Sequence, residues 1–397
     1  MLNKDNKREL CYIVKIDWVK PIENADNIEL VGINAWTCIA KKDEFNVGDL
    51  AVYFEIDSKL PKEDWSAFME SKRYIVKTMK LNKFKVISQG LALPISAFGW
   101  TTDNKTINAN GKTYKLGDFL TEDLGVRYSV EEDNKRKGNS SVDKYKKMIQ
   151  RHPKVFNNPI IKKIYKTKLG KRILFIFFGK KKDNVSWLSW VVKTDEERIE
   201  NLPHLFNSDM LWIATEKVDG TSATYTIKRK GKKGDFYVCS RNVVFTELNK
   251  NNYYYDKNVY TEMADKLNME SVLKKMLKDY PKANYITIQG EIYGEGIQKR
   301  DYGMKGTDFK AFNLIFDGNR CNSIEMKNIL YKYNIPTIDI LDTEFVMPNT
   351  IDELRAYVHN DMSKIDGKMR EGIVFRSQDG KQSFKCVDPE YLIKYHG

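Results

Sequence analysis

The N-terminal part of the chain, up to about residue 125, consists of short apolar runs separated by turn residues. The runs are rich in β-branched and aromatic residues, and Asn, Asp, Gly or Pro bound them, which is typical of β-strands. They are LCYIVKIDWV at 10–19, IELVGINAW at 28–36, DLAVYFEI at 49–56 and FKVISQGLALPI at 84–95. Such closely spaced strands predict a small β-barrel. An oligonucleotide-binding (OB) barrel is one member of that class, which periodicity alone does not select.

From about residue 190 onward, the pattern alternates between strands and helices. The strand-like runs are LWIATEKV, SATYTIKR, FYVCSR, YITIQGEIYG, KAFNLIFD, GIVFR and SFKCV, and helical patterns lie near 258–279, 323–333 and 351–359. Thr194 and Glu197 have the spacing of a capping box, which predicts a helix opening there. The C-terminal half is therefore predicted to be an α/β domain.

Between these parts, the stretch from Lys135 to Lys182 holds seventeen Lys or Arg residues and one acid, Asp143. The whole chain carries a net charge of +13, so its entire basic excess is local to this segment. A charge run of this kind is often a solvated, partly disordered linker. The alternative is an arm that follows nucleic-acid phosphates, with Tyr145, Phe156 and Tyr165 interleaved for stacking.

The same basic segment contains helix breakers and one apolar run. Pro153, Pro159 and Gly170 argue against a single long helix. The run ILFIFFG at 173–179 is compatible with an anchoring strand or with a membrane-surface patch, and the sequence does not separate the two. It is far shorter than the ~20 residues that a membrane-spanning helix needs.

Composition narrows the class of protein. A pI near 9.1 predicts a polyanionic partner, with nucleic acid favoured over an anionic membrane. The cysteines form no C-x-x-C pair, which argues against a structural zinc site or a disulfide framework and for a reducing compartment. The polar N-terminus lacks the apolar region of a signal peptide. We therefore expect a soluble intracellular protein of the cytoplasm or nucleus, and a viral or phage genome is one source that would fit.

Two near-copies of one short pattern offer a candidate lysine nucleophile: TEKVDGTS at 215–222 and SKIDGKM at 363–369. A lysine that attacks phosphorus must lose its proton, and it needs carboxylates for a metal and cations for a triphosphate. A nucleotide also needs an aromatic face for its base. Lys217 is followed by a series of such residues, whereas Lys364 has only 33 residues after it. The pattern therefore favours Lys217.

The series after Lys217 forms six motifs in a fixed order: EKVDG, SRN, GEIYG, AFNLIFDG, EGIVFR and SFKCV. This order resembles the covalent nucleotidyltransferase superfamily of polynucleotide ligases and mRNA capping enzymes. Within that superfamily, the β-rich domain at the N-terminal side is similar to the OB domain of the fifth family of RNA ligases, through GDLAVYFEIDSKLP and VISQGLALP. The segment KTDEERIENLP at 193–203 also resembles that family.

The resemblance implies an α+β protein in three parts. Residues 1–130 would form an OB-like, nucleic-acid-binding β-barrel, and 131–192 a basic insertion or linker. Residues 193–397 would form an ATP-grasp-like adenylyltransferase domain of antiparallel sheets and helices.

The implied reaction is ATP-dependent joining of RNA ends at nicks in duplexes, as in RNA repair, with Mg²⁺ or Mn²⁺ as the metal. Lys217 would take AMP, pass it to a 5′-phosphate, and a 3′-hydroxyl would then displace it. RNA or an RNA-containing nicked duplex would bind the OB-like domain and the basic 135–182 segment. We expect a monomer with no membrane partner.

The resemblance also assigns roles to residues around the nucleophile. Glu216 and Lys217 would flank the adenine and the α-phosphate, and Asp219 and Gly220 would shape the nucleophile loop. Lys385 would hold the α-phosphate.

The remaining roles fall on residues further along the chain. Arg241 would contact the ribose or a phosphate, Glu291 the ribose hydroxyls, and Phe312 would stack on adenine. Glu371 would help to position the metal.

One position departs from the family pattern. Related ligases often carry a second lysine two residues after the first in the last motif, where this chain has Val387, and Lys394 is the candidate substitute. Two alternatives remain open from sequence: a GTP-using nucleotidyltransferase of the capping type, and a catalytically inactive nucleic-acid-binding protein with a ligase fold.

Overall fold

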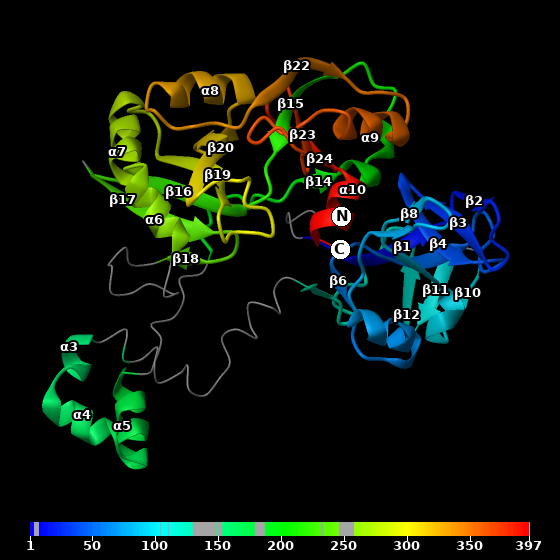
Figure 1. Cartoon of the computed structure of the whole chain (residues 1–397), viewed down its shortest axis with the longest axis horizontal. Helices are drawn as coiled ribbons and strands as arrows, with labels where there is room; N and C mark the ends of the chain where they lie inside the picture. The colour runs from blue at the N-terminus through cyan, green and yellow to red at the C-terminus, as the bar shows by residue number, and fades with distance from the viewer. Residues whose placement is uncertain are drawn as a thin grey trace. The chain divides into compact units, whose positions relative to one another are not determined.

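The structure is a computed structural model that describes residues 1–3, 8–103, 105–109, 111–129, 149, 153–178, 187–231, 233–245 and 258–396 (Figure 1). The chain divides into two compact units. Unit 1 combines residues 1–132 with 195–218 and 339–397, and unit 2 comprises 133–194 and 219–338. The predicted C-terminal domain thus contributes strands to both units.

The N-terminal part of unit 1 is built on a three-stranded antiparallel sheet in the order β1-β5-β9, formed by Cys11–Lys15, Leu50–Phe54 and Leu91–Pro94. Successive side chains of a strand point to opposite faces, and here both faces are buried. Ile13, Val52 and Leu93 enter one apolar cluster. Tyr53 and Ala92 enter another. The continuous apolar runs of the sequence follow from this two-sided burial.

Smaller antiparallel sheets complete this part, and all four runs predicted as strands contain strands. Their members are β2 Trp18–Pro21, β3 Ile28–Ile33, β4 Trp36–Lys41, β6 Ser58–Lys59, β7 Met79–Leu81, β8 Val86–Ser88, β10 Thr101–Thr102, β11 Thr106–Ala109, β12 Lys112–Lys115 and β13 Arg127–Tyr128. Two 3₁₀ helices, η1 Asp64–Lys72 and η2 Ile95–Phe98, lie among them.

The C-terminal part of unit 1 is a five-stranded sheet in the order β14-β24-β23-β15-β22. The strands are Glu197–Arg198, Ser383–Val387, Gly372–Ser377, Leu211–Lys217 and Ile340–Val346, and only the β14–β24 pair is parallel. The remaining elements are η3 Ile199–Asn201, η4 Pro203–Leu205, helix α9 Ile351–His359, helix α10 Pro389–Tyr391 and the π-helix η5 Leu392–His396.

The helix predicted from Thr194 and Glu197 is wrong. The Thr194 hydroxyl accepts a hydrogen bond from Ser222 Oγ at 2.9 Å, and Glu197 begins strand β14 instead of a helical turn. The backbone groups of this segment make hydrogen bonds to β24 instead of bonds within a helix. Tertiary contacts therefore override the local helix signal.

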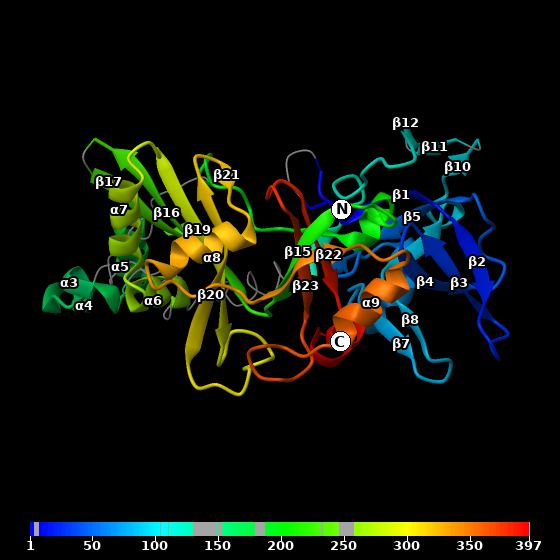
Figure 2. The same ribbon diagram turned by 90° about the horizontal axis from the view of Figure 1, so that it is seen from above.

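Unit 2 contains a six-stranded antiparallel sheet in the order β18-β17-β16-β19-β20-β21 (Figure 2). The strands are Val244–Phe245, Lys233–Ser240, Thr221–Lys230, Tyr285–Gly294, Thr307–Phe316 and Asn319–Arg320. Helices α6 Val259–Lys266 and α7 Met269–Asp279 contact β16, β17 and β19 between them, and α8 Ser323–Tyr331 contacts β20. These helices confirm the predicted helical patterns, as α9 does in unit 1.

The described part of the basic segment is helical: α3 Pro153–Phe156, α4 Pro159–Tyr165 and α5 Lys168–Phe178 (Figure 1). The prediction that Pro153 and Pro159 break this segment is confirmed, because each opens a new helix. The break predicted at Gly170 is wrong, because Gly170 lies inside α5. The strand considered for ILFIFFG is wrong, because Ile173–Phe178 belongs to α5. Most of 135–152 and all of 179–182 lie outside the described residues. Among the described helices, none is long and apolar enough to cross a membrane.

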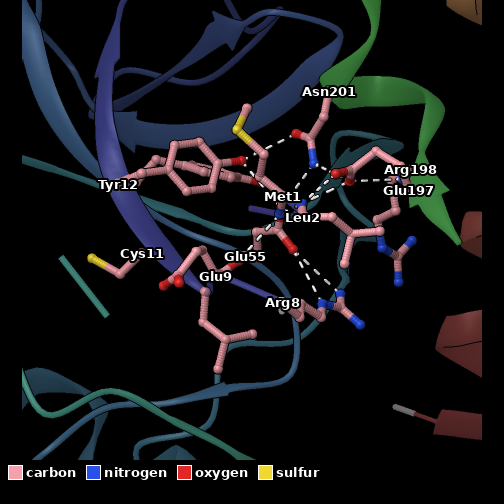
Figure 3. Close-up of polar contacts among 12 residues, drawn as sticks. Met1, Leu2, Arg8, Glu9, Cys11, Tyr12, Glu55, Glu197, Arg198 and Asn201 are labelled. Carbon is pink, nitrogen blue, oxygen red and sulfur yellow. Dashed lines mark hydrogen bonds and ion pairs between the residues drawn. The ribbon is translucent and has the colours of Figure 1, made fainter. Parts of the chain in front are cut away.

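A buried polar network joins the N-terminal β-domain to the five-stranded sheet within unit 1 (Figure 3). The side chain of Asn201 donates to Glu55 Oε1 at 2.9 Å and to Glu197 Oε1 at 2.8 Å. Its carbonyl oxygen accepts from Trp36 Nε1 at 2.7 Å and lies 3.1 Å from the Tyr12 hydroxyl. Since every partner is itself buried or half-buried, the network orients both parts of the unit.

Glu55 is the charged centre of this network and is 1 % exposed. Burial alone would raise the pKa of its carboxyl, but the amino group of Met1 and the guanidinium of Arg8 outweigh that effect, and with the hydrogen bond from Asn201 they hold the pKa at about 2. Arg8 Nη2 lies 3.3 Å from Glu55 Oε2. A carboxylate whose pKa is lowered by folding stabilises the folded state at neutral pH.

We expect Glu55→Gln to lower the free energy of unfolding by about 3–5 kcal/mol at pH 7, because it leaves Arg8 buried without its counter-charge. The difference in the free energy of unfolding between wild type and variant should be largest above pH 4.5. It should decline as the pH falls toward about 2, where Glu55 becomes protonated. Urea denaturation across this pH range measures both effects. The exposed Glu70→Gln is the control, and equal losses in the two variants would contradict this role of Glu55.

Candidate active site

The end of β15 and the start of β23 bring Lys217 to Glu371 in unit 1. Lys217 is the last residue of β15 and pairs with Gly372, the first residue of the antiparallel β23. Glu371 immediately precedes Gly372, and its Oε2 lies 2.6 Å from Lys217 Nζ. Both side chains are largely buried, so this ion pair is better shielded from water than a surface pair.

The register of the same sheet assigns Lys217, Lys385 and Arg198 to one face. Thr215 pairs with Val374, which pairs with Lys385, and Lys385 pairs with Arg198 on β14. Directly paired residues share a face, and Lys217 lies two positions from Thr215, so it shares this face too.

The opposite face of the sheet is apolar. Trp212, Ile373, Phe375 and Phe384 pack there with α9 in one buried cluster. Because successive side chains of a strand point to opposite faces, one face of the sheet packs into the core and the other carries the cations.

On the cationic face, the ammonium group of Lys385 has a strongly lowered pKa. Burial of its ammonium group lowers the pKa to about 7, and the positive charges of Arg8, Arg198 and Lys217 add to that effect. Asp195 opposes it only in part. A surplus of close positive charge is unfavourable by itself, and an anion would relieve it.

Arg198 is a candidate residue that the sequence analysis did not identify. Its side chain is buried, yet Nε and Nη1 have no hydrogen-bond partner among the residues that the structure describes. The guanidinium carbon lies 5.8 Å from the centroid of the Trp36 ring, a contact that gives these two N–H groups no acceptor. Buried N–H groups without an acceptor are costly unless a ligand supplies one, and guanidinium groups match phosphate geometry. The one signal in the sequence was the resemblance of KTDEERIENLP, which contains Arg198.

Glu216 lies on the other side of the strand from Lys217 and is buried. Its carboxylate accepts hydrogen bonds from Ser363 Oγ at 2.5 Å and from the Lys364 amide at 2.8 Å. Glu216, in the first near-copy TEKVDGTS, thus holds the loop that contains the second near-copy, SKIDGKM. Lys364 itself lies in a turn.

In unit 2, Glu291 lies on β19 opposite Ser222 of β16 and Lys310 of β20. Ser222 Oγ lies 3.4 Å from Glu291 Oε2. A Cβ atom at Gly220 would meet the Ile292 carbonyl oxygen at 2.3 Å, so only glycine lets the nucleophile loop pass so close to β19.

Phe312 occupies a β-bulge. Gln289 pairs with Asn313 and Gly290 with Ala311, so Phe312 is an extra residue in β20. A bulge redirects side chains, and Phe312 stays half-buried.

Asp219 and Arg241, two further predicted site residues of unit 2, lie next to strand ends. The amide of the buried Asp219 donates to the Tyr302 hydroxyl at 2.7 Å, and Gln298 Nε2 donates to the Gly220 carbonyl at 2.9 Å. These bonds fix the nucleophile loop within unit 2. Arg241 directly follows β17 and is half-buried.

The last motif ends differently from the family pattern. Val387 is buried at the end of β24. Lys394 is exposed in η5, with Nζ 5.1 Å from the centroid of the Tyr395 ring. Nothing in this geometry links Lys394 to Lys385, so its role stays a prediction.

The described residues contain no group of three or more His, Cys, Asp or Glu side chains arranged to hold a metal ion. Mg²⁺ is often bound through one or two carboxylates together with substrate phosphates and water. Glu371, a largely buried carboxylate beside the cationic face, fits that kind of site.

Comparisons with known proteins agree with this architecture. A family model for RNA ligases matches residues 210–396, and a model of an OB-fold domain matches residues 10–95. The comparison with curated proteins gives no match.

Solved structures of the Naegleria gruberi RNA ligase match nearly the whole chain. The structure with pyrophosphate has 26% sequence identity and a TM-score of 0.70, covering 98% of this chain and 99% of that one. A lysine-to-alanine variant with ATP and Mn and a glutamate-to-alanine variant with AMP and Mn have the same identity and coverage, with a TM-score of 0.71. From the family models and this likeness, the chain belongs to the RNA ligases with an N-terminal OB-fold domain.

Proposed function

We propose that this RNA ligase uses ATP to seal 3′-hydroxyl and 5′-phosphate ends at nicks, through a lysyl–AMP intermediate on Lys217. The observation that carries the proposal is the position of Lys217 beside Glu371, on the face that Lys385 and Arg198 share. The Naegleria ligase structures with ATP, AMP and Mn support the choice of nucleotide and of a divalent metal.

In the first step, neutral Lys217 Nζ attacks the α-phosphorus of ATP. A nitrogen–phosphorus bond forms while the bond from the α-phosphorus to the bridging oxygen breaks, and pyrophosphate leaves with that oxygen. The ammonium form of Lys217 must first give up one proton, and Glu371, 2.6 Å from Nζ, is the acceptor that we assign. The amine loses its second proton to solvent or to the leaving pyrophosphate as the nitrogen–phosphorus bond forms. The product is a lysyl–AMP phosphoramidate.

Lys385 and Arg198 would stabilise the phosphates. The transferred phosphoryl group gains charge on its oxygens, and fixed cations act most strongly in a site with little water. Lys385 is charged when its pKa of about 7 is raised by an approaching anion, and Arg198 remains charged at any working pH. A divalent cation at Glu371 would neutralise further phosphate charge when bound.

The nucleoside would be held by residues of unit 2. Glu291 would accept hydrogen bonds from the ribose hydroxyls, and Arg241 would contact the ribose or a phosphate. The half-buried ring of Phe312 would stack on adenine, because the bulge redirects this side chain and the ring stays partly exposed.

In the later steps, AMP passes to the 5′-phosphate of one RNA end, forming a pyrophosphate linkage. The 3′-hydroxyl of the other end then attacks that phosphate, a phosphodiester forms and AMP leaves. The OB-fold domain and the cations of the basic 135–182 segment would hold the RNA, most directly through its phosphates. The protein would act as a monomer.

The first experiment tests nucleotide attachment with α-labelled ATP and, separately, α-labelled GTP in the presence of magnesium. Label should come from ATP and survive denaturing electrophoresis. Lys217→Ala should abolish it, whereas the matched Lys364→Ala should leave it near the wild-type level, because Lys364 lies in a turn. A Lys217→Ala protein that still becomes labelled would contradict the proposal, and label from GTP would indicate capping chemistry.

The charge of Lys385 should be visible as proton uptake. At a pH of about 8, most Lys385 is neutral before binding, since its pKa is about 7, and the triphosphate should draw a proton onto it. Calorimetry with α,β-methylene ATP, in buffers of different ionisation enthalpy, should detect up to about one proton per nucleotide. Lys385→Met should remove this uptake and the exposed Lys381→Met should keep it. Identical uptake in both variants would contradict the assignment.

The basic segment should contribute to RNA binding through charge. Replacing the exposed Lys162, Lys163 and Lys166 by Gln should weaken binding and reduce the salt slope, by about 0.7–0.9 for each lost phosphate contact. The control replaces three exposed lysines outside the segment, Lys274, Lys278 and Lys282. If both triple variants keep the wild-type slope between 50 and 200 mM salt, these cations do not contact RNA.

A further inference from the structure

Helix α5 has apolar side chains on two different faces. One face belongs to the small core of the helical group α3–α5, whose helices are drawn in Figure 1. In that core, Leu174 is buried with Phe156, and Phe175 and Phe178 pack against them. This core accounts for only part of the apolar content of the helix.

The second face is exposed. Leu169, Ile173, Ile176 and Phe177 are 69, 44, 64 and 75 % exposed. Their spacing of i, i+4, i+7 and i+8 forms a single stripe along a helix. A stripe of four large apolar side chains in water is costly, and such a patch marks an interaction surface.

Helix α4 repeats the arrangement in shorter form. Ile160 and Ile164, four positions apart, are also exposed. A Cβ atom at Gly170 would meet the Ile164 carbonyl oxygen at 2.0 Å, so the start of α5 packs directly on the end of α4. The two exposed apolar stripes therefore belong to one compact hairpin.

The same hairpin is strongly basic. Residues 153–178 contain seven Lys or Arg residues and no acid. Lys162, Lys163, Lys166 and Arg172 are exposed. The occupant of this surface must therefore be anionic as well as apolar.

We propose that the α4–α5 hairpin binds an anionic lipid surface, with its apolar stripes between the acyl chains and its cations at the headgroups. RNA phosphates, which we propose above as contacts of the same lysines, would leave the aliphatic stripes in water, so RNA and an anionic lipid surface would compete for these cations. A bilayer with anionic headgroups matches both features. Helix α5 is about 16 Å long, too short to span a bilayer, so it would lie in the plane of the interface. This surface departs from our expectation of no membrane partner.

The test is co-sedimentation of the full-length protein with phosphatidylcholine vesicles, with and without phosphatidylserine. The wild-type protein should bind the serine-containing vesicles and bind phosphatidylcholine alone at least about tenfold more weakly. Ile176→Ser combined with Phe177→Ser removes apolar surface but no charge, and it should weaken binding by about tenfold or more. Tyr331→Ser, an 82 % exposed aromatic residue on α8, is the matched control and should bind as wild type.

RNA binding by the same variants separates the possible occupants. Ile176→Ser/Phe177→Ser should retain wild-type affinity for RNA and wild-type nucleotide attachment. The proposal is overturned if the wild-type protein ignores both vesicle types, or if the double variant binds serine-containing vesicles as tightly as wild type. It is equally overturned if the double variant loses RNA affinity in step with lipid affinity, because the stripe would then belong to an RNA site.

Discussion

Lys217 and Glu371 are 154 positions apart in the chain, yet their side chains lie 2.6 Å apart because β15 ends where β23 begins. Everything that the site can do depends on this antiparallel register. A slip by one residue would turn Lys217 toward the apolar core and Glu216 toward the cationic face. The opposite face, packed around Trp212 and Phe375, makes such a slip costly. Packing of the core thus specifies the position of Lys217.

The OB-fold domain takes part in the electrostatics of this sheet. Its Arg8 is one of the charges that lower the pKa of Lys385, and Glu55 balances Arg8 while bonding to Asn201 beside β14. The N-terminal domain therefore contributes charge to the cationic face of the five-stranded sheet. It supplies part of the field in which the lysine of the last motif works, and a change in the Glu55 network should reach that lysine through charge and not through contact.

Much of the fold could be predicted from the sequence, because its apolar runs and helical periods are strong and local. The failures have physical causes. Thr194 and Glu197 have the spacing of a helix start, but the segment pairs with β24 as strand β14 instead. The apolar run of α5 is too short for its pattern to distinguish a strand from a helix. The order of the motifs pointed to Lys217, Glu371 and Lys385. The position of the buried Arg198, whose Nε and Nη1 have no hydrogen-bond partner among the described residues, and the bulge at Phe312 depend on register, which no local pattern contains.

The central claim is that Lys217 is the residue that carries AMP. The most direct measurement is to incubate the protein with ATP and a divalent metal, digest it under conditions that preserve phosphoramidates, and locate the nucleotide by tandem mass spectrometry. The account predicts AMP on the peptide that contains Lys217, and on no peptide that contains Lys364 or Lys385. An adduct on either of those lysines, or none on Lys217 in a protein that ligates RNA, would contradict it.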